Sequence, residues 1–234
     1  MKRNELNSAE RYPRKWGTRS SHQLVLSYIG EGDGKRALDI GCARGHLLQE
    51  LVIRGWNCMG IDSDASDVAT CIACGLVALE HDITTGFPES LGKFDLVVLG
   101  DVLEHLPDPL RVLQNVRSLL NPGARIIVSV PNVAHLSVRV QILFGRFRYS
   151  SRGILDKTHL RFFTRRTTLE LITNSGFTVN QITASAVPLE LVWPGLTKSI
   201  FGRVVLALND RLPALWSGGF AYQNILVASS CYET

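Results

Sequence analysis

One acidic residue and three small residues occupy every second position of the segment Asp39-x-Gly41-x-Ala43-x-Gly45, a spacing that suits a nucleotide-like ligand carrying positive charge. The preceding residues have the apolar pattern of a buried parallel strand, and a helical pattern follows the glycines. A strand, a glycine turn and a helix place backbone N–H groups at the carboxyl end of a sheet, where such ligands bind. Asp39 would repel a dinucleotide pyrophosphate and attract a cationic amino acid group. The Gly-x-x-x-Gly spacing also differs from the Gly-x-Gly-x-x-Gly of dinucleotide-binding turns.

The same segment resembles the first motif of the class I S-adenosylmethionine-dependent methyltransferases. That family usually has glycine where Ala43 stands, and alanine still allows a close backbone approach where its φ is negative. The resemblance implies that S-adenosylmethionine is the cofactor. It also implies that Asp39, Gly41, Ala43 and Gly45 contact this cofactor.

Asp62 ends the next predicted strand, 21 residues after Gly41. An acid at this position can accept two hydrogen bonds from a ribose diol. The alternative is that Asp62 caps the following helix, but Asp64 can take that position and leave Asp62 for the cofactor. We therefore expect Asp62 and its neighbour Ser63 to bind the cofactor.

The ends of two further predicted strands complete the expected cofactor site. By the same resemblance, Asp82 would hydrogen-bond the adenine amino group and Ile83 would pack on the adenine ring. The alternative for Asp82 is an ordinary turn residue. Gly100 and Asp101 follow Phe94–Leu99, a continuous apolar run of the kind found in fully buried strands, and are expected to face the cofactor.

The segment from residue 94 to residue 109, FDLVVLGDVLEHLPDP, is a second motif. It resembles the Phe-Asp…Glu-His-x-x-Asp segment of methyltransferases that act on ubiquinone precursors, sugars and other small molecules. The chain has no Asn-Pro-Pro-Tyr type sequence, which in the family marks methylation of planar amines in nucleic acid and of protein glutamine. The resemblance therefore implies an oxygen or carbon acceptor.

Three histidines are candidates for the base that such a reaction needs. Transfer of a methyl group to a hydroxyl requires removal of its proton, and a histidine with a pKa near neutrality is the usual base. The candidates are His159, His135 and His105, and the alternative for each is a hydrogen-bonded structural histidine. We favour His159, because Asp156 precedes it and could orient its ring.

The stretch Arg139–Arg166 contains eight basic residues and one acid, interleaved with aromatic residues. Three interpretations remain open. The stretch could bind a phosphate-bearing substrate, such as a nucleotide sugar or a diphosphate-linked lipid glycan. It could bind RNA, or it could be a solvated surface.

The segments Ser129-Val-Pro-Asn and Leu143-Phe-Gly-Arg-Phe, together with residues 153–164, resemble a bacterial methyltransferase group often associated with cell-surface polysaccharide genes. The resemblance favours O-methylation of a glycan, nucleotide sugar or lipid-linked saccharide. One alternative is O-methylation of a quinone precursor or another small phenol. Another is a non-catalytic or RNA-binding module on the same fold, although a nucleic acid partner is the less favoured reading.

Strand and helix patterns alternate from residue 35 to about residue 185, which predicts an α/β fold with a doubly wound, mostly parallel sheet. Residues 1–34 are interpreted as an N-terminal cap segment and residues 35–234 as a methyltransferase domain. Insertions near 132–166 and 188–219 should lie at the carboxyl edge of the sheet. The family resemblance implies seven strands with an antiparallel last strand. The seven predicted strands are 35–40, 57–61, 76–81, 94–99, 124–130, 177–183 and 222–229.

The composition favours the cytoplasm. Five cysteines are an odd number without the spacing of a disulfide framework, which indicates reduced thiols. Cys71-x-x-Cys74 has no second pair, so we predict small buried side chains and no metal site. The first 21 residues lack the apolar core of a signal peptide, and no stretch has the length of a membrane span.

Residues 188–219 combine leucine and valine with aromatic and basic residues, among them Trp193, Phe201 and Trp216. This segment could be a lid that packs on the core or a contact in a homodimer. It could also lie on a membrane, which would make the protein peripheral to the inner face of that membrane.

Overall fold

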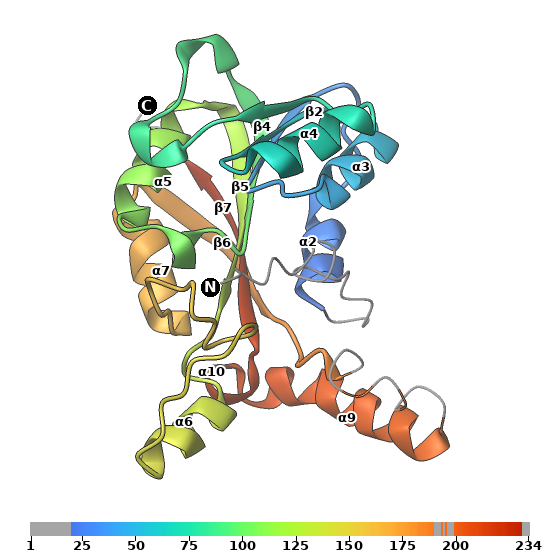
Figure 1. Cartoon of the computed structure of the whole chain (residues 1–234), viewed down its shortest axis with the longest axis vertical. Helices are drawn as coiled ribbons and strands as arrows, with labels where there is room; N and C mark the ends of the chain where they lie inside the picture. Colours follow the sequence, from blue (N-terminus) through green and yellow to red (C-terminus); the bar gives the residue numbers. More distant parts are fainter. Residues whose placement is uncertain (1–19, 190–192, 194, 196–198, 231–234) are drawn as a thin grey trace, which may run out of the picture.

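The computed structural model describes residues 20–189, 193, 195 and 199–230 (Figure 1). One seven-stranded sheet forms its centre, with the strand order β3-β2-β1-β4-β5-β7-β6. β7 is antiparallel to both of its neighbours, whereas the other described pairs are parallel. The predicted α/β class and the antiparallel last strand are therefore confirmed. The strands are β1 (Arg36–Ile40), β2 (Asn57–Asp62), β3 (Ala78–Glu80), β4 (Phe94–Gly100), β5 (Leu120–Pro131), β6 (Phe177–Ala184) and β7 (Gln223–Ser230).

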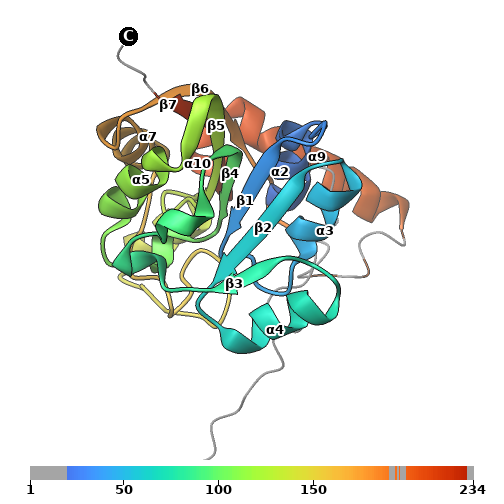
Figure 2. The same cartoon turned by 90° about the horizontal axis from the view of Figure 1, so that it is seen from above.

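Helices cover both faces of this sheet, as the view from above shows (Figure 2). One face carries α2 (Ser21–Ile29), α3 (His46–Ile53) and α4 (Ala65–Ala73), and the other carries α5 (Pro109–Ser118) and α7 (Arg165–Asn174). The apolar side chains of the central strands alternate between these two layers. In β4, Val97 and Leu99 join the core beneath α5 and α7, whereas Leu96 and Val98 join the core beneath α2 and α3. A strand buried on both faces explains the unbroken apolar run in the sequence.

Local sequence signals set where the helices begin. The Asp108 side chain accepts a hydrogen bond from the backbone N–H of Arg111, and Pro109 occupies the first turn of α5. α7 begins with a capping box, in which the hydroxyl groups of Thr164 and Thr167 each accept from the other residue's backbone N–H. These caps end the loops that lead from the carboxyl edge of the sheet.

The described part of the N-terminal segment packs on the domain. Val25, Leu26 and Ile29 of α2 are buried in the same core as residues of β1 and α3. Residues 1–19 of the predicted cap segment lie outside the described residues.

Both predicted insertions contain helices at the carboxyl edge of the sheet (Figure 1). The first contains α6 (Leu136–Leu143), and a small apolar cluster of Val138, Ile154 and Leu155 holds it to the following loop. The second contains α9 (Ile200–Leu215) and α10 (Ser217–Phe220). Among the helices that the structure describes, none is both long enough and apolar enough to cross a bilayer.

The strand order reverses between β1 and β4, which are neighbours in the sheet although β2 and β3 separate them in sequence. The loops after β1 and β4 therefore diverge to opposite faces and leave a crevice at the carboxyl edge. Ligands of open parallel sheets bind at such a point. The functional site is built from the residues that surround this crevice.

Candidate functional site

The turn after β1 is left-handed at three positions: Gly41 has φ 71°, Ala43 has φ 45° and Gly45 has φ 78°. A Cβ atom on Gly41 would lie 2.5 Å from Cγ2 of Val102, so no larger residue fits there without a shift of the loop after β4. This close contact joins the two loops that border the crevice. Gly45 occupies the N-cap position of α3.

Ala43 contradicts the expectation of a negative φ. A left-handed alanine is strained, because its Cβ approaches backbone oxygen. The backbone N–H of Ala43 donates a 2.8 Å hydrogen bond to Oδ2 of Asp62, and this contact holds the strained turn against the end of β2. This bond was not predicted, because Ala43 follows β1 whereas Asp62 ends β2.

Asp62 has a second backbone partner, since its Oδ1 accepts a 3.0 Å hydrogen bond from the N–H of Asp64. The predicted cap of α4 is confirmed: the Asp64 side chain accepts from the N–H groups of Ser66 and Asp67. Asp62 is half-buried at the crevice, and its neighbour Ser63 is exposed. A carboxylate has about four acceptor positions, so Asp62 can accept further hydrogen bonds from a ligand.

Asp39 is the most deeply buried acid of this group, with 3% of its surface exposed. Among the described residues, its Oδ2 has no hydrogen-bond partner. Burial, and to a smaller extent the nearby charge of Asp62, raise the pKa of Asp39 to about 8. A cation bound beside Asp39 would stabilise its ionised form. The site therefore fits the positively charged amino acid end of S-adenosylmethionine.

Asp82 and Ile83 lie in the loop after β3. The Asp82 side chain accepts hydrogen bonds from the backbone N–H of Thr84 at 2.9 Å and from its hydroxyl group at 2.7 Å. These bonds cap the short 3-10 helix η1 (Ile83–Thr85) and lower the pKa of Asp82. The turn role considered for Asp82 is therefore present, and its exposed carboxylate also faces solvent. Ile83 is buried at the edge of the apolar core.

Asp101 follows Gly100 at the end of β4 and has a positive φ of 59°. Its Oδ1 accepts hydrogen bonds from the hydroxyl group of Ser129, at 2.9 Å, and from Nε2 of Gln223, at 2.5 Å. Ser129 and Gln223 belong to β5 and β7, so these bonds join the ends of three strands. Sequence reasoning placed Asp101 at the crevice but missed both partners, which are pairing neighbours only in the folded sheet.

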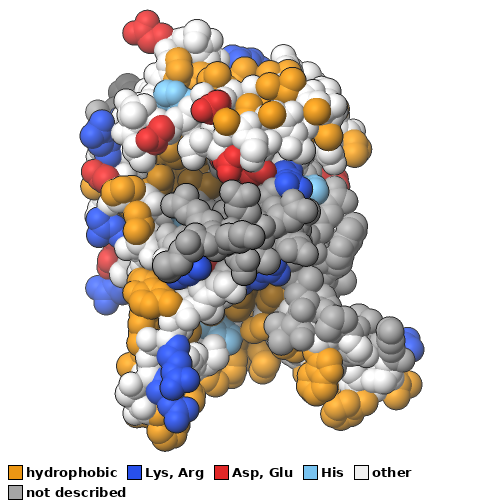
Figure 3. All heavy atoms as spheres, viewed as in Figure 1, with side chains coloured by type: hydrophobic (Ala, Val, Ile, Leu, Met, Phe, Trp, Pro, Cys, Tyr) orange, Lys and Arg blue, Asp and Glu red, His pale blue; other side chains and the backbone are white. Residues whose placement is uncertain are grey.

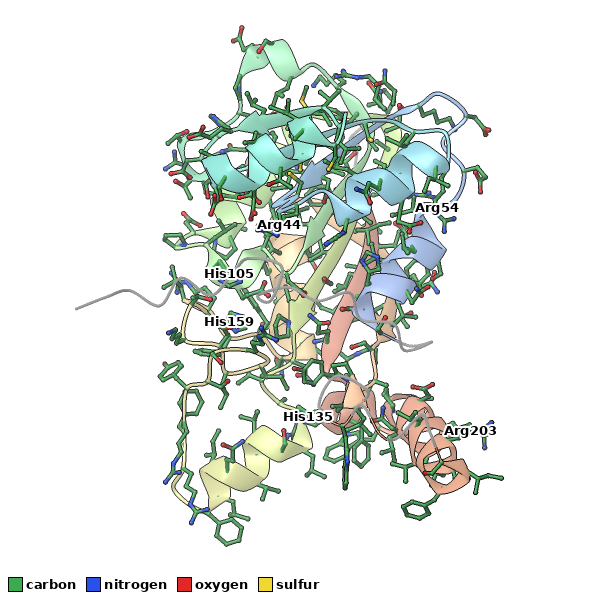
Figure 4. The ribbon with its side chains drawn as sticks, turned by 45° about the vertical axis from the view of Figure 1, so that its right-hand side comes forward. Arg44, Arg54, His105, His135, His159 and Arg203 are labelled. Carbon is green, nitrogen blue, oxygen red and sulfur yellow. The ribbon has the colours of Figure 1, made fainter. Side chains whose placement is uncertain are left out.

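Glu104, His105 and His159 form what we call the Glu-His-His cluster, in which one ligand atom of each residue lies within 4.8 Å of the others. The ring centroids of His105 and His159 are 4.9 Å apart, and the rings meet edge to face (Figure 4). Glu104 is almost completely buried. Its backbone carbonyl accepts hydrogen bonds from the N–H groups of Leu160 and Arg161, which hold the loop of His159 against the 3-10 helix η3 (Leu103–His105).

Carbonyl groups orient both rings of the cluster. Nδ1 of His159 lies 3.0 Å from the carbonyl oxygen of Ile154, and Nδ1 of His105 lies 3.2 Å from that of Thr158. A carbonyl can only accept, so each Nδ1 carries the proton. In the neutral ring, Nε2 is then the atom that can take a proton. Burial lowers the pKa of His159, and His105 lowers it further, so neutral imidazole predominates at pH 7.

The expected role of Asp156 is wrong. Its Oδ1 accepts from the backbone N–H and the hydroxyl group of Thr158, at 2.9 Å and 2.8 Å, and the carbonyl of Ile154 orients His159 instead. Asp156 therefore shapes the turn that leads to His159. An aspartate two residues before a Thr or Ser commonly forms this kind of turn.

A carboxylate and two imidazoles are also donors that ligate divalent cations such as zinc. Neither this set nor any other metal site was predicted from the sequence, because residues 104 and 159 are far apart in the chain. Cys71 and Cys74 are free thiols of different exposure, the first buried and the second exposed.

His135 lies apart from the cluster (Figure 4). It is the N-cap residue of α6, where its Nδ1 accepts from the backbone N–H of Ser137 at 3.3 Å. Its ring meets Tyr222 edge to face, and burial lowers its pKa. The structure thus brings together two of the three histidines proposed as bases and gives the third a structural contact.

Comparison with known proteins identifies relatives of this chain. A family model described as methyltransferase domain matches residues 10–182. A ubiquinone biosynthesis O-methyltransferase of Marinobacter nauticus is 37% identical over 120 residues, which are 47% of this chain and 50% of that protein. A protein of the same name from Pseudomonas aeruginosa is 28% identical over 204 residues, which are 76% of this chain and 88% of that protein. A solved SAM-dependent methyltransferase from Archaeoglobus fulgidus has a TM-score of 0.60 at 21% identity, covering 90% of this chain and 95% of that one.

Replacement of Asp39 by asparagine should change how stability depends on pH. The folded-state pKa of about 8 is above the ordinary value of 3.8, so the folded protein holds this proton more tightly than the unfolded chain. The protonated Asp39 therefore contributes to the free energy of unfolding. This contribution is fully present below pH 3.8 and is lost as the pH rises to about 8. The wild type should therefore lose more than about 1 kcal/mol of unfolding free energy relative to Asp39→Asn between pH 5 and pH 8.5.

Urea denaturation at pH 5, 7 and 8.5 would measure this difference. Asp95→Asn is the matched control, because hydrogen bonds from the backbone of Arg36 and the side chain of Asn121 lower the pKa of Asp95. An aspartate with a lowered pKa is already ionised in both states across this range, so its variant should differ from the wild type by a constant amount. A constant difference for Asp39→Asn as well would contradict the proposed protonation of Asp39.

Proposed function

This chain belongs to the methyltransferase domain family and is an S-adenosylmethionine-dependent methyltransferase, and we propose that it methylates a hydroxyl group of a small organic acceptor. A phenol related to quinone precursors is the first candidate for that acceptor. The adjacent imidazoles of His105 and His159 at the carboxyl edge carry this proposal.

The bound cofactor supplies an electrophilic methyl group attached to a sulfonium. We propose that the glycine turn holds its amino acid end, that Asp62 and Ser63 bind the ribose, and that the loop after β3 binds the adenine. The buried carboxylate of Asp39 and the half-buried one of Asp62 support this assignment, because both lie at the crevice. The proposed cofactor-binding residues are Asp39, Gly41, Ala43, Gly45, Asp62, Ser63, Asp82, Ile83 and Gly100.

We propose His159 as the base that removes the proton of the acceptor hydroxyl. Its Nδ1 is engaged by the carbonyl of Ile154, which leaves Nε2 as the proton acceptor, and burial favours the neutral ring. His105 would position His159 through the edge-to-face contact. The alternative use of the cluster is to hold a divalent cation that binds the acceptor oxygen.

Two arguments favour a phenol over the saccharide that the sequence analysis put first. The curated relatives from Marinobacter and Pseudomonas carry the name ubiquinone biosynthesis O-methyltransferase. A phenol also has a pKa of about 10, against about 16 for water and similarly high values for alcohols. A histidine base is better matched to the more acidic group, because proton transfer is easier when the two pKa values are closer.

A saccharide that bears phosphate remains the second candidate. A groove of about 600 Å³ lies between α6 and α7, and its lining includes Arg139, Arg165 and Arg166. Part of this positive charge serves the fold: Arg139 donates to the carbonyls of Ala134 and Gly218, and Arg166 forms an ion pair with Glu170. The remaining charge supports a phosphate group.

The acceptor can be found by transfer of an isotope-labelled methyl group from S-adenosylmethionine into a fractionated bacterial extract. We expect the label in the phenolic and quinone-precursor fraction. Label in the saccharide or lipid-linked glycan fraction would select the second candidate. Label in RNA alone would reject both. Heat-inactivated protein is the control.

We infer a cytoplasmic location. The four described cysteines are free thiols, which suits a reducing compartment. Cys231 lies outside the described residues.

Asp62→Ala should abolish detectable cofactor binding in isothermal titration calorimetry. The variant loses the carboxylate proposed for the ribose and also the partner of the Ala43 N–H that holds the strained turn. Asp64→Ala is the matched control on the same loop: it removes the cap of α4, at about 1 kcal/mol of stability, but should leave cofactor affinity within a few fold. Unchanged affinity in Asp62→Ala would remove this residue from the site.

His159→Gln should leave cofactor affinity intact and slow methyl transfer by about 100-fold or more, because glutamine can keep a hydrogen bond to Ile154 but cannot take a proton. His135→Gln is the control and should keep most of the wild-type rate. Wild-type kcat should fall as the pH drops below the usual histidine range, and this dependence should disappear in His159→Gln. A normal rate in the variant would exclude His159 as the base, and loss of activity with EDTA would favour the cation instead.

A further inference from the structure

Two separate segments leave large apolar side chains exposed at the same end of the molecule. In α6 and the loop after it, Leu143 is 79% exposed and Phe144 is 70% exposed. In α9, Ile200 is 80% exposed and Phe201 is 74% exposed. Figure 1 shows both helices projecting from the carboxyl edge of the sheet, away from the layers that cover its faces.

The apolar residues of α9 form one face of the helix. Ile200, Val204, Leu208 and Leu215 are all exposed and are separated by four, four and seven residues. This spacing places them in one stripe along a helix of 16 residues, which is about 24 Å long. Only Gly202 and Pro213 of α9 are buried, so the stripe contributes little to the described core.

α6 repeats this arrangement on a smaller scale. Leu136, Val140 and Phe144 are exposed and are separated by four residues each, and Leu143 lies beside them. Val138 is the one residue of α6 that is buried in the structure as described. The aromatic side chains of Phe147 and Tyr149 continue the exposed apolar surface into the following loop and pack edge to face against each other. We call the exposed apolar residues of α6, its loop and α9 the apolar end.

Basic side chains border the apolar end. The exposed residues Arg146, Arg148 and Arg152 follow α6, while Arg203 and Arg211 lie in α9. No acidic residue occurs from residue 136 to residue 155, and Asp210 is the acid of α9. Figure 3 shows orange apolar atoms at the tips of both projections, with blue basic side chains beside them. This surface combines apolar and positively charged groups, as amphipathic helices at membrane surfaces do.

We propose that the apolar end docks on the surface of an anionic lipid bilayer, with α6 and α9 lying in the interface. The basic side chains complement the negative headgroups, and the apolar stripes can enter the boundary between headgroups and acyl chains. Both projections lie at the same end of the molecule (Figure 1). A second copy is disfavoured, because a two-fold contact centred on α9 would bring Arg203 of one copy towards Arg211 of the other.

Docking through the apolar end would turn the carboxyl edge of the sheet towards the bilayer. His105 and His159 of the Glu-His-His cluster lie at this edge (Figure 4). An acceptor with a lipid tail could then reach the cluster without leaving the membrane. This consequence rests on the proposed function, whereas docking itself does not.

Co-sedimentation of the full chain with vesicles tests docking without methyl transfer. Large unilamellar vesicles of phosphatidylethanolamine and phosphatidylglycerol, in a ratio of about 3:1, are compared with phosphatidylcholine vesicles. The first kind of vesicle has an anionic surface, and the second kind has none. The wild type should partition onto the anionic vesicles, and more weakly onto the neutral ones. Ile200→Ser/Phe201→Ser and Leu143→Ser/Phe144→Ser should each weaken this partition by about tenfold or more.

Ile53→Ser/Ile72→Ser is the matched control, because these isoleucines of α3 and α4 are also highly exposed but lie away from the apolar end. It should partition like the wild type. Circular dichroism and calorimetric binding of S-adenosylmethionine confirm that each variant is folded. No partition of the wild type at any lipid concentration, or an equal loss in the control, would overturn the proposal.

Sedimentation velocity identifies the competing occupant. The proposal would be wrong if the wild type were a dimer that does not bind vesicles and that the substitutions Ile200→Ser/Phe201→Ser dissociate. The apolar end would then be a contact between two copies of the chain. A monomer that binds anionic vesicles supports it. Docking and methyl transfer are measured separately, so the failure of one leaves the other intact.

Discussion

Because the strand order reverses between β1 and β4, the loops that follow these strands separate and open a crevice at one edge of the sheet. The other features of the site depend on this reversal. The glycine turn borders the crevice on one side, and Asp101 with η3 borders it on the other. Val102 lies so close to Gly41 that a Cβ atom on this residue would not fit between the two sides. A single topological feature therefore brings together a cofactor site and a candidate base that are about 100 residues apart in sequence.

The two aspartates Asp39 and Asp62 at the crevice have different surroundings. Asp62 is stabilised by backbone N–H donors from Ala43 and Asp64, which also fix the turn. Asp39 is buried without an equivalent donor for its Oδ2 among the described residues, and its pKa is raised to about 8. A cationic ligand would satisfy Asp39 at little structural cost, since the surroundings are already formed. The surroundings of the turn therefore favour a positively charged ligand over a negatively charged one.

The two insertions place further side chains at the same edge of the sheet. The first carries His159 to His105 through backbone hydrogen bonds to Glu104, so the position of the cluster depends on main-chain contacts more than on side-chain identity. It also contributes α6, while the second insertion contributes α9. The exposed apolar residues of α6 and α9 do not belong to the two large core clusters. The residues that stabilise the fold therefore differ from those proposed to contact a membrane.

Local sequence patterns were sufficient for the strands of the sheet and for the cap of α4 by Asp64, because apolar periodicity and capping residues act over a few neighbouring positions. They did not predict α2, α6, α9 or α10. They also identified the glycine turn and the acids beside it. Contacts between distant residues were decided only in the tertiary structure. These include the bond from Ala43 to Asp62, the partners of Asp101 on β5 and β7, and the Glu-His-His cluster. Asp156 was misassigned for the same reason: proximity in sequence favoured it, whereas the folded loop presents the carbonyl of Ile154 to the ring. The sequence determines which groups are available, and chain topology determines which of them meet, because a hydrogen bond depends on distance in space and not on separation along the chain.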